Sequence, residues 1–96
     1  MNKNQLSFRH RGIKRFYEKN DPRGVPADQA KRIRRGLSAL EAANKVSDLH
    51  AVPGWQLHPL NGIFEEYWSI RINRNWRLIF RFENNRAFDL DLVDYH

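Results

Sequence analysis

The sequence predicts an α+β fold: an antiparallel β-sheet of about four strands, mostly in the C-terminal half, with two N-terminal α-helices packed on one of its faces. Three observations support this fold class. Apolar residues recur at helical spacing in residues 1–50, strict alternation follows in residues 51–96, and nine of the twelve aromatic residues lie in that second half. Because 96 residues cannot form two independently packed cores, we expect one domain spanning residues 1–96.

Two amphipathic helices are expected in the first half. A polar start and a short extended segment ending near Phe8 precede the first helix, which runs from about residue 9 to residue 19. Residues 20–26 contain two prolines and a glycine and end it. A second helix follows, with Asp28 in its first turn and with an apolar stripe formed by Ala30, Ile33, Leu37 and Leu40. Gly36 within that helix costs about 1 kcal/mol relative to alanine, so we expect a close packing contact there.

Strand signals follow a weakly periodic connector at residues 44–54. A short strand is expected at residues 56–60, and three longer ones at residues 67–72, 76–82 and 87–93. Short turns join the longer strands, which makes an antiparallel meander with one apolar face that the helices must cover. The residues expected on that face are Trp68, Ile70, Ile72, Trp76, Leu78, Phe80, Phe82, Phe88, Leu90 and Leu92.

The formal net charge of +6 is unevenly distributed. Residues 1–50 contain 12 Lys and Arg against 5 Asp and Glu, whereas residues 51–96 contain 5 Arg against 6 Asp and Glu. The positive surplus therefore belongs to the helical half. It favours a polyanionic partner, and a solvated basic helix face explains it equally well.

Several classes of protein are excluded by what the sequence lacks. The absence of cysteine excludes a disulfide framework and thiol chemistry. Because no secretory signal and no membrane-spanning apolar run occurs, we expect a cytoplasmic location without membrane association. With no glycine-rich phosphate loop and no histidine pair at ligand spacing, we expect neither a metal nor a cofactor.

Imidazole and guanidinium groups are the remaining candidates for chemistry. RNA strand scission needs a base for the 2′-OH proton, cations to stabilise the phosphorane and an acid to protonate the leaving 5′-oxygen. Histidine and arginine can fill these roles. The candidate side chains lie on the expected sheet or at the carboxyl end: His58, Arg71, Arg77, Arg81, Tyr95 and His96.

The charged candidates also have structural interpretations. Arg81 and Arg77 share a strand face with Asp89 and Asp91, so a cross-strand ladder of ion pairs explains all four without a function, and it is preferred to a metal pair of the two aspartates. His58 can equally be an ordinary polar loop residue.

The aromatic and terminal candidates carry two further conditions. The three tryptophans, Trp55, Trp68 and Trp76, are better explained as core residues than as base-stacking platforms. An unbroken last strand would turn His96 toward the core. The strand must therefore end or twist near Asp94 if His96 is to reach a substrate.

Six segments, in order over nearly the whole chain, carry a family resemblance. They are FRHRGIK at 8–14, GVPA at 24–27, LHPL at 57–60 followed by Gly62, YWSI at 67–70, NWRLIF at 75–80 and DYH at 94–96. Together they resemble the HigB-type (plasmid maintenance killer) toxins of the RelE/ParE superfamily. The resemblance implies a RelE-like toxin of a type II toxin–antitoxin system, an endoribonuclease that enters the ribosomal A site and cleaves mRNA there without a metal.

The resemblance also implies residue roles. His96 and Arg77 would form the leading catalytic pair, supported by His58, Tyr95 and Asp94. Substrate binding would fall to Arg71, Asn61, Asn73 and Arg74, and ribosome docking to the basic helix residues Lys31, Arg32, Arg34 and Arg35. Asn61 and Asn73 stand where the family has a lysine and an arginine, which weakens stabilisation of the phosphorane unless Arg71 or Arg74 substitutes.

The implied partners are the ribosome with its mRNA and a cognate HigA-like antitoxin with a helix-turn-helix fold. Two other functions stay open: a non-enzymatic inhibitor that binds DNA gyrase, as in the ParE branch, and a plain RNA- or ribosome-binding domain. The joint presence of His58, Arg77 and His96 favours the nuclease, because a binding module has no need of these side chains.

Overall fold

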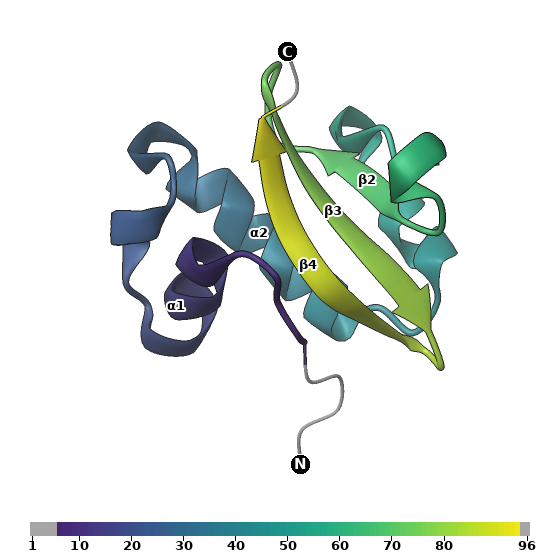
Figure 1. Cartoon of the computed structure of the whole chain (residues 1–96), viewed down its shortest axis with the longest axis horizontal. Coiled ribbons are helices and arrows are strands. Elements are labelled where there is room, and N and C mark those ends of the chain that lie inside the picture. The colour runs from purple at the N-terminus through teal and green to yellow at the C-terminus, as the bar shows by residue number, and fades with distance from the viewer. Residues whose placement is uncertain (1–5, 95–96) are drawn as a thin grey trace.

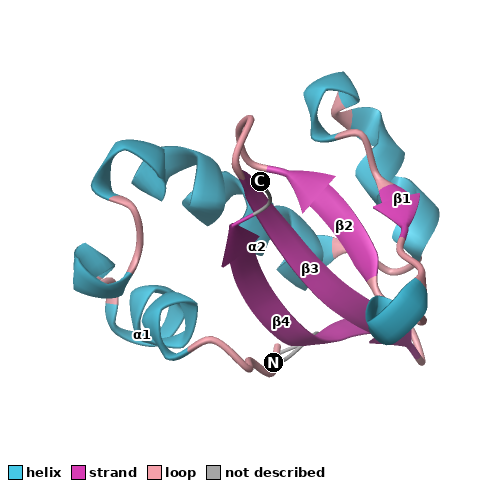
Figure 2. Ribbon diagram, turned by 45° about the horizontal axis from the view of Figure 1, so that its top comes forward, coloured by secondary structure: helices cyan, strands magenta, loops and turns pink. Residues whose placement is uncertain are grey.

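The computed structural model describes residues 6–94 of the chain. Two helices, α1 (Arg11–Lys19) and α2 (Ala30–Ala42), precede the strands β1 (His58–Pro59), β2 (Trp68–Arg71), β3 (Trp76–Glu83) and β4 (Arg86–Asp94). The strands form one antiparallel sheet in the order β1-β2-β3-β4, which confirms the predicted meander (Figures 1 and 2). Short 3-10 helices occupy the connections at Pro22–Gly24, Ala27–Gln29, Val46–Ala51, Pro53–Trp55 and Gly62–Phe64.

Helix α2 lies across the inner face of the sheet, and α1 lies beside it on the β4 side (Figures 1 and 2). The apolar stripe Ile33, Leu37 and Leu40 of α2 is fully buried in one core with the inner strand residues. The close contact expected at Gly36 is present, because a Cβ there would lie 3.1 Å from Leu78 Cδ2. The glycine therefore lets α2 approach the sheet closely.

The extended segment predicted before α1 pairs with the last strand. Phe8 forms a parallel bridge with Leu90, and the Arg9 N–H donates to the Leu90 carbonyl at 2.7 Å. Helix α1 then begins two residues later than expected, because His10 Nδ1 accepts from the Ile13 N–H at 3.1 Å and caps the helix. These bonds attach the first helix to the sheet edge.

Glycine is required where α1 meets the turn that follows it. A Cβ on Gly24 would lie 2.7 Å from Gly12 Cα, and a Cβ on Gly12 would overlap the Gly24 carbonyl. The two backbones therefore touch directly, which only glycine permits at both positions.

Two sequence predictions were wrong in detail. Asp28 lies in the 3-10 turn before α2 and not in its first turn. Phe88 lies on the outer face with Arg81, because Asp89 adopts a left-handed conformation (φ 54°) and forms a β-bulge. The bulge moves Ala87 into the core position expected for Phe88, where Ala87 is fully buried.

The tryptophans belong to the core, as predicted. Trp55 is buried, and Trp68 and Trp76 pack half-buried against the core cluster. No helix within residues 6–94 is long and apolar enough to cross a membrane.

Candidate active site

A shallow hollow lies on the outer face of the sheet, opposite α2. Its volume is about 30 Å³, which is comparable to a single water molecule. Cross-strand pairing of His58 with Ser69 and of Arg77 with Val93 brings its residues together. They are His58, Leu60, Phe64, Ser69, Arg77, Ile79 and Val93. The sheet therefore places two of the predicted catalytic side chains around one hollow, and a substrate would lie over it and not within it.

His58 is exposed at the rim of this hollow. Its Nδ1 lies 2.8 Å from the carbonyl oxygen of Gln56. A carbonyl can only accept a hydrogen bond, so Nδ1 carries the hydrogen and the neutral ring keeps its lone pair on Nε2. Gln56 holds this carbonyl in place from a left-handed conformation (φ 48°, ψ 52°). Nε2 is therefore the ring nitrogen without a hydrogen in this tautomer.

Arg77 is half-buried at the start of β3. Its Nη1 donates to the carbonyl of Asn73 at 2.9 Å, and to those of Arg74 and Trp76 at 3.5 Å. These acceptors belong to the β2–β3 turn and to the first residue of β3, and they fix one edge of the planar guanidinium. A fixed cation of this kind can stabilise charge that develops on a phosphate.

Ser69 lies between these two side chains and was not singled out from the sequence. Only 1% of the residue is exposed, and its Oγ makes no hydrogen bond to any described residue. Buried hydroxyls normally have a partner, so an unsatisfied one beside a candidate site is unusual. Strand parity had placed Ser69 on the polar face, and nothing else in the sequence distinguished it. Ile79 lies on the same face and is fully buried, which makes this part of the outer face more apolar than predicted.

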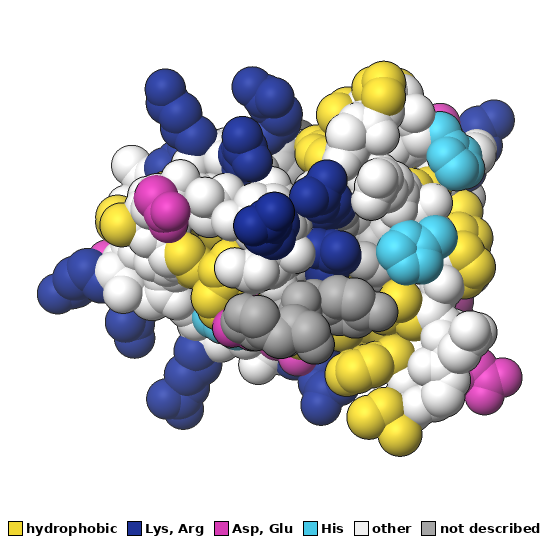
Figure 3. Space-filling view, turned by 90° about the horizontal axis from the view of Figure 1, so that it is seen from above, with side chains coloured by type: hydrophobic (Ala, Val, Ile, Leu, Met, Phe, Trp, Pro, Cys, Tyr) yellow, Lys and Arg dark blue, Asp and Glu magenta, His cyan; other side chains and the backbone are white. Residues whose placement is uncertain are grey.

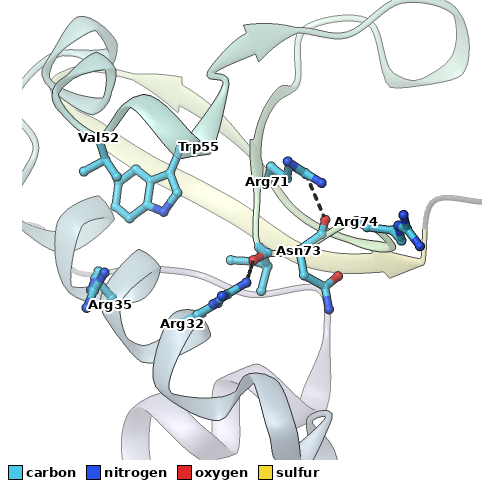
Figure 4. A pocket seen from close by; sticks show the side chains of 9 residues that line it. Arg32, Arg35, Val52, Trp55, Arg71, Asn73 and Arg74 are labelled. Carbon is cyan, nitrogen blue, oxygen red and sulfur yellow. Dashed lines mark hydrogen bonds between the residues drawn. The ribbon is translucent and has the colours of Figure 1, made fainter.

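A larger cleft, of about 380 Å³, opens at the end of the sheet beside the β2–β3 turn. We call it the arginine cleft, because Arg32 and Arg35 of α2 lie across it from Arg71 and Arg74 (Figure 4). Its remaining lining residues are Val52, Gly54, Trp55, Ile72 and Asn73. Figure 3 views the molecule from this end. Lys and Arg side chains cluster on this surface, and histidine side chains lie to one side of them.

Asn73 connects the arginine cleft to the hollow. Its Oδ1 accepts from the N–H groups of Asn75 and Trp76, both at 2.8 Å, and so closes the turn. Its carbonyl accepts from Arg71 Nε at 3.3 Å and from Arg77 Nη1 at 2.9 Å. The backbone carbonyl of residue 73 therefore orients two neighbouring arginines, and the asparagine side chain closes the turn that holds this carbonyl.

The other residues implied by the resemblance lie at different distances from the hollow. Asn61 is exposed before a 3-10 turn and lines neither the hollow nor the arginine cleft. Asp94 ends β4 as the partner of Trp76, next to the Arg77–Val93 pair. Tyr95 and His96 lie outside the described residues.

The basic residues of α2 separate into two groups. Arg32 and Arg35 line the arginine cleft. Arg34 contacts α1 instead, donating to Asn20 Oδ1 at 2.6 Å with its guanidinium carbon 4.4 Å from the centre of the Phe16 ring. Lys31 is exposed and lines neither the hollow nor the cleft. Helical spacing alone had treated all four as one docking face.

The predicted ladder of ion pairs forms only in part. Arg81 pairs with Glu66 at 2.9 Å and with Asp89 at 3.5 Å. Asp91 lies opposite Ile79, and Arg77 lies opposite Val93, so the strand register does not place Asp91 against Arg77. Within residues 6–94, no group of three or more His, Asp and Glu side chains is arranged to hold a metal ion.

Comparison with known proteins decides the family. The family model described as the RelE-like toxin of type II toxin–antitoxin system HigB matches residues 6–96. The chain belongs to the HigB family. This confirms the resemblance found in the sequence.

Two curated relatives support the assignment to the HigB family. The endoribonuclease HigB of Proteus vulgaris is 42% identical over 90 residues, covering 94% of this chain and 97% of the relative. The toxin HigB-1 of Vibrio cholerae is 33% identical over 85 residues, covering 88% and 90%.

Solved structures share the fold of this HigB-family chain at much lower sequence identity. YafQ from E. coli superimposes with a TM-score of 0.57 at 13% identity, covering 96% of this chain and 93% of that one. A chain of the YoeB-YefM complex from Staphylococcus aureus gives a TM-score of 0.54 at 21% identity, covering 98% of both chains. These likenesses confirm the α+β architecture.

Proposed function

We propose that this HigB-family chain is a ribosome-dependent endoribonuclease that cuts mRNA in the ribosomal A site. The observation that carries the proposal is the shared hollow of His58 and Arg77 on the outer face of the sheet. The name of the Proteus vulgaris relative, an endoribonuclease, supports the same activity. As an enzyme that acts on translating ribosomes, it would work in the cytoplasm.

The proposed reaction is transfer of the phosphodiester to the neighbouring 2′-oxygen. A histidine takes the 2′-OH proton, the 2′-oxygen attacks phosphorus, and the bond to the 5′-oxygen breaks as a second group returns a proton to it. The products are a 2′,3′-cyclic phosphate and a 5′-OH. Arg77 stabilises the charge on the phosphorane. His58 accepts the proton at Nε2, because its Nδ1 donates to the carbonyl of Gln56.

His96 is the other proposed proton-transfer group, and Tyr95 and Asp94, which precede it in the sequence, are proposed to support it. Asp94 is the strand partner of Trp76 and therefore adjoins Arg77 in the sheet.

The proposed partners are the mRNA, the ribosome and an antitoxin. Arg71, Arg74, Asn73 and Asn61 are proposed to bind substrate, and the basic residues of α2 to approach the ribosome. The heterotetrameric YoeB-YefM toxin-antitoxin complex from Staphylococcus aureus, which contains a protein of this fold, supports an antitoxin partner. We propose a helix-turn-helix antitoxin for this chain.

The test is cleavage of mRNA on programmed ribosomes, read as new 5′ ends by primer extension. The proposal expects new ends with the wild-type protein and their loss in Arg77→Ala and His96→Ala. Cleavage that survives both substitutions would remove the proposed site. A parallel DNA gyrase supercoiling assay separates the rival, because inhibition there without mRNA cleavage would identify a gyrase inhibitor.

A further inference from the structure

We propose that the arginine cleft binds the phosphate backbone of single-stranded mRNA next to the scissile phosphodiester. This inference rests on the proposed function, because it extends the substrate path away from the His58–Arg77 hollow. It also gives Arg32 and Arg35 a role as mRNA contacts, where the sequence had predicted ribosome docking.

Charge is the first argument. Among the described residues, those that line the cleft include four arginines and no carboxylate. None of the four forms an ion pair with a described Asp or Glu. Arg32 and Arg35 are also neighbours on one helix face, where like charges repel. Four uncompensated cations around one concave space are unfavourable in the free protein and become favourable once an anion enters.

The donors of these arginines are suited to phosphate. Arg32 uses Nη1 to hold the Ile72 carbonyl at 3.2 Å, and Arg71 uses Nε to hold the Asn73 carbonyl at 3.3 Å. Each guanidinium has five N–H donors, so these bonds orient the planar groups while most donors stay available. An oriented guanidinium group can donate two parallel hydrogen bonds to two oxygens of one phosphate.

Continuity with the hollow favours RNA over an acidic peptide. Arg71 is the direct strand partner of Arg77, and both donate to the carbonyl of Asn73. A strand whose scissile phosphate lies at Arg77 therefore meets Arg71 and Arg74 next. A cleft of about 380 Å³ has room for a phosphate with its sugar, whereas the hollow does not.

The arginine cleft is expected to contact the phosphate backbone of the RNA and not its bases. Trp55 lines it but is only 7% exposed, so its ring offers no open face for stacking. Phosphate contacts position a nucleic acid without carrying sequence information. Variants of the cleft are thus expected to weaken binding to all sequences alike.

The test measures binding of a short 2′-O-methyl RNA to the purified full-length protein by fluorescence anisotropy at several salt concentrations. The blocked 2′-oxygen prevents cleavage, so binding is read without turnover. The double variant Arg35→Gln with Arg74→Gln is compared with the double variant Lys14→Gln with Lys19→Gln, whose two lysines lie on α1. Both remove two exposed positive charges, and neither control residue lines the arginine cleft. Thermal melts check that both double variants are folded.

We expect the cleft variant to lose about tenfold or more in affinity and about 1.4 in the slope of log K against log salt, since each single-strand phosphate contact adds about 0.7. The control should lose less than about threefold. Equal losses in the two variants, or no loss in the cleft variant, would overturn the proposal. Preferential binding of an oligoglutamate peptide of equal charge would also overturn it and would indicate a protein-binding cleft.

The primer-extension assay distinguishes this failure from failure of the proposed function. If Arg77→Ala still cleaves mRNA, the catalytic assignment fails, whatever the RNA-binding measurements on the cleft variant show. If cleavage depends on Arg77 but RNA binding ignores Arg35 and Arg74, only the cleft proposal fails.

Discussion

The two ends of the outer sheet face carry the same residue type in opposite electrostatic settings. Near the β2–β3 turn, Arg71 and Arg77 are held by backbone carbonyls. At the other end, Arg81 pairs with Glu66 and Asp89 and lies over the Phe88 ring at 4.9 Å. Backbone carbonyls orient Arg71 without changing its charge, whereas the carboxylates of Glu66 and Asp89 compensate the charge of Arg81. The turn end is therefore suited to bind phosphate, and the other end to support the sheet.

The largest effect is expected when Arg77, at the turn end of the outer face, is replaced. Arg77→Ala should lower ribosome-dependent cleavage by about 10²- to 10³-fold, because a fixed donor to the phosphorane is lost. Arg81→Ala on the same strand should stay within about threefold, since its partly exposed ion pairs contribute about 1 kcal/mol or less to stability. Rates of new 5′-end formation for the two variants measure this. Equal loss in both would contradict a functional difference between the two ends.

The next effect is a loss of stability when the Asn73 side chain, which closes the β2–β3 turn, is removed. Asn73→Ala removes an acceptor of two backbone hydrogen bonds at 2.8 Å, which costs about 1–2 kcal/mol of unfolding free energy. For a domain of this size that lowers Tm by about 4–8 °C per kcal/mol. Asn61→Ala is the matched control, because the Asn61 side chain makes no capping bond. A thermal melt that leaves the two variants alike would show that the turn does not depend on Asn73.

Ser69→Ala tests whether the buried hydroxyl of Ser69 lowers the free energy of unfolding. Its Oγ is buried without a hydrogen-bond partner among the described residues. Ser69→Ala should therefore leave the unfolding free energy unchanged or raise it by about 1 kcal/mol. Denaturant melts measure this change. A loss of more than about 1 kcal/mol would mean that the hydroxyl is satisfied in solution.

The smallest effect concerns a paired group far from the site. Arg23 donates to Asp21 at 2.8 and 2.9 Å and, together with its own backbone N–H, lowers the pKa of Asp21 from 3.8 to about 2. Between about pH 4 and pH 2 the unfolded chain binds more protons at this residue, so its contribution to stability is lost as the pH falls. Asp21→Asn should flatten acid unfolding in that window. Identical acid titrations of the two proteins would contradict the pairing.

Sequence patterns succeeded where a residue's environment follows from local periodicity. The stripe Ile33, Leu37 and Leu40, the meander and the close approach at Gly36 were all expected. The prediction that Phe88 faces the core was wrong, because alternation assumes an unbroken strand. The β-bulge at the left-handed Asp89 adds one residue to β4 and shifts the alternation. The amide of Asp89 donates to Ser7 Oγ at 2.9 Å, a partner 82 positions away that no local pattern reveals.

By itself, the sequence determined the family, the fold class and the candidates His58 and Arg77, because these depend on residue identity and spacing along the chain. Only the tertiary structure decided how cations are shared. It separated Arg32 and Arg35 from Arg34 and joined them to Arg71 and Arg74 around one cleft. Charges act through space, so their grouping depends on how α2 and the β2–β3 turn meet and not on their order in the chain.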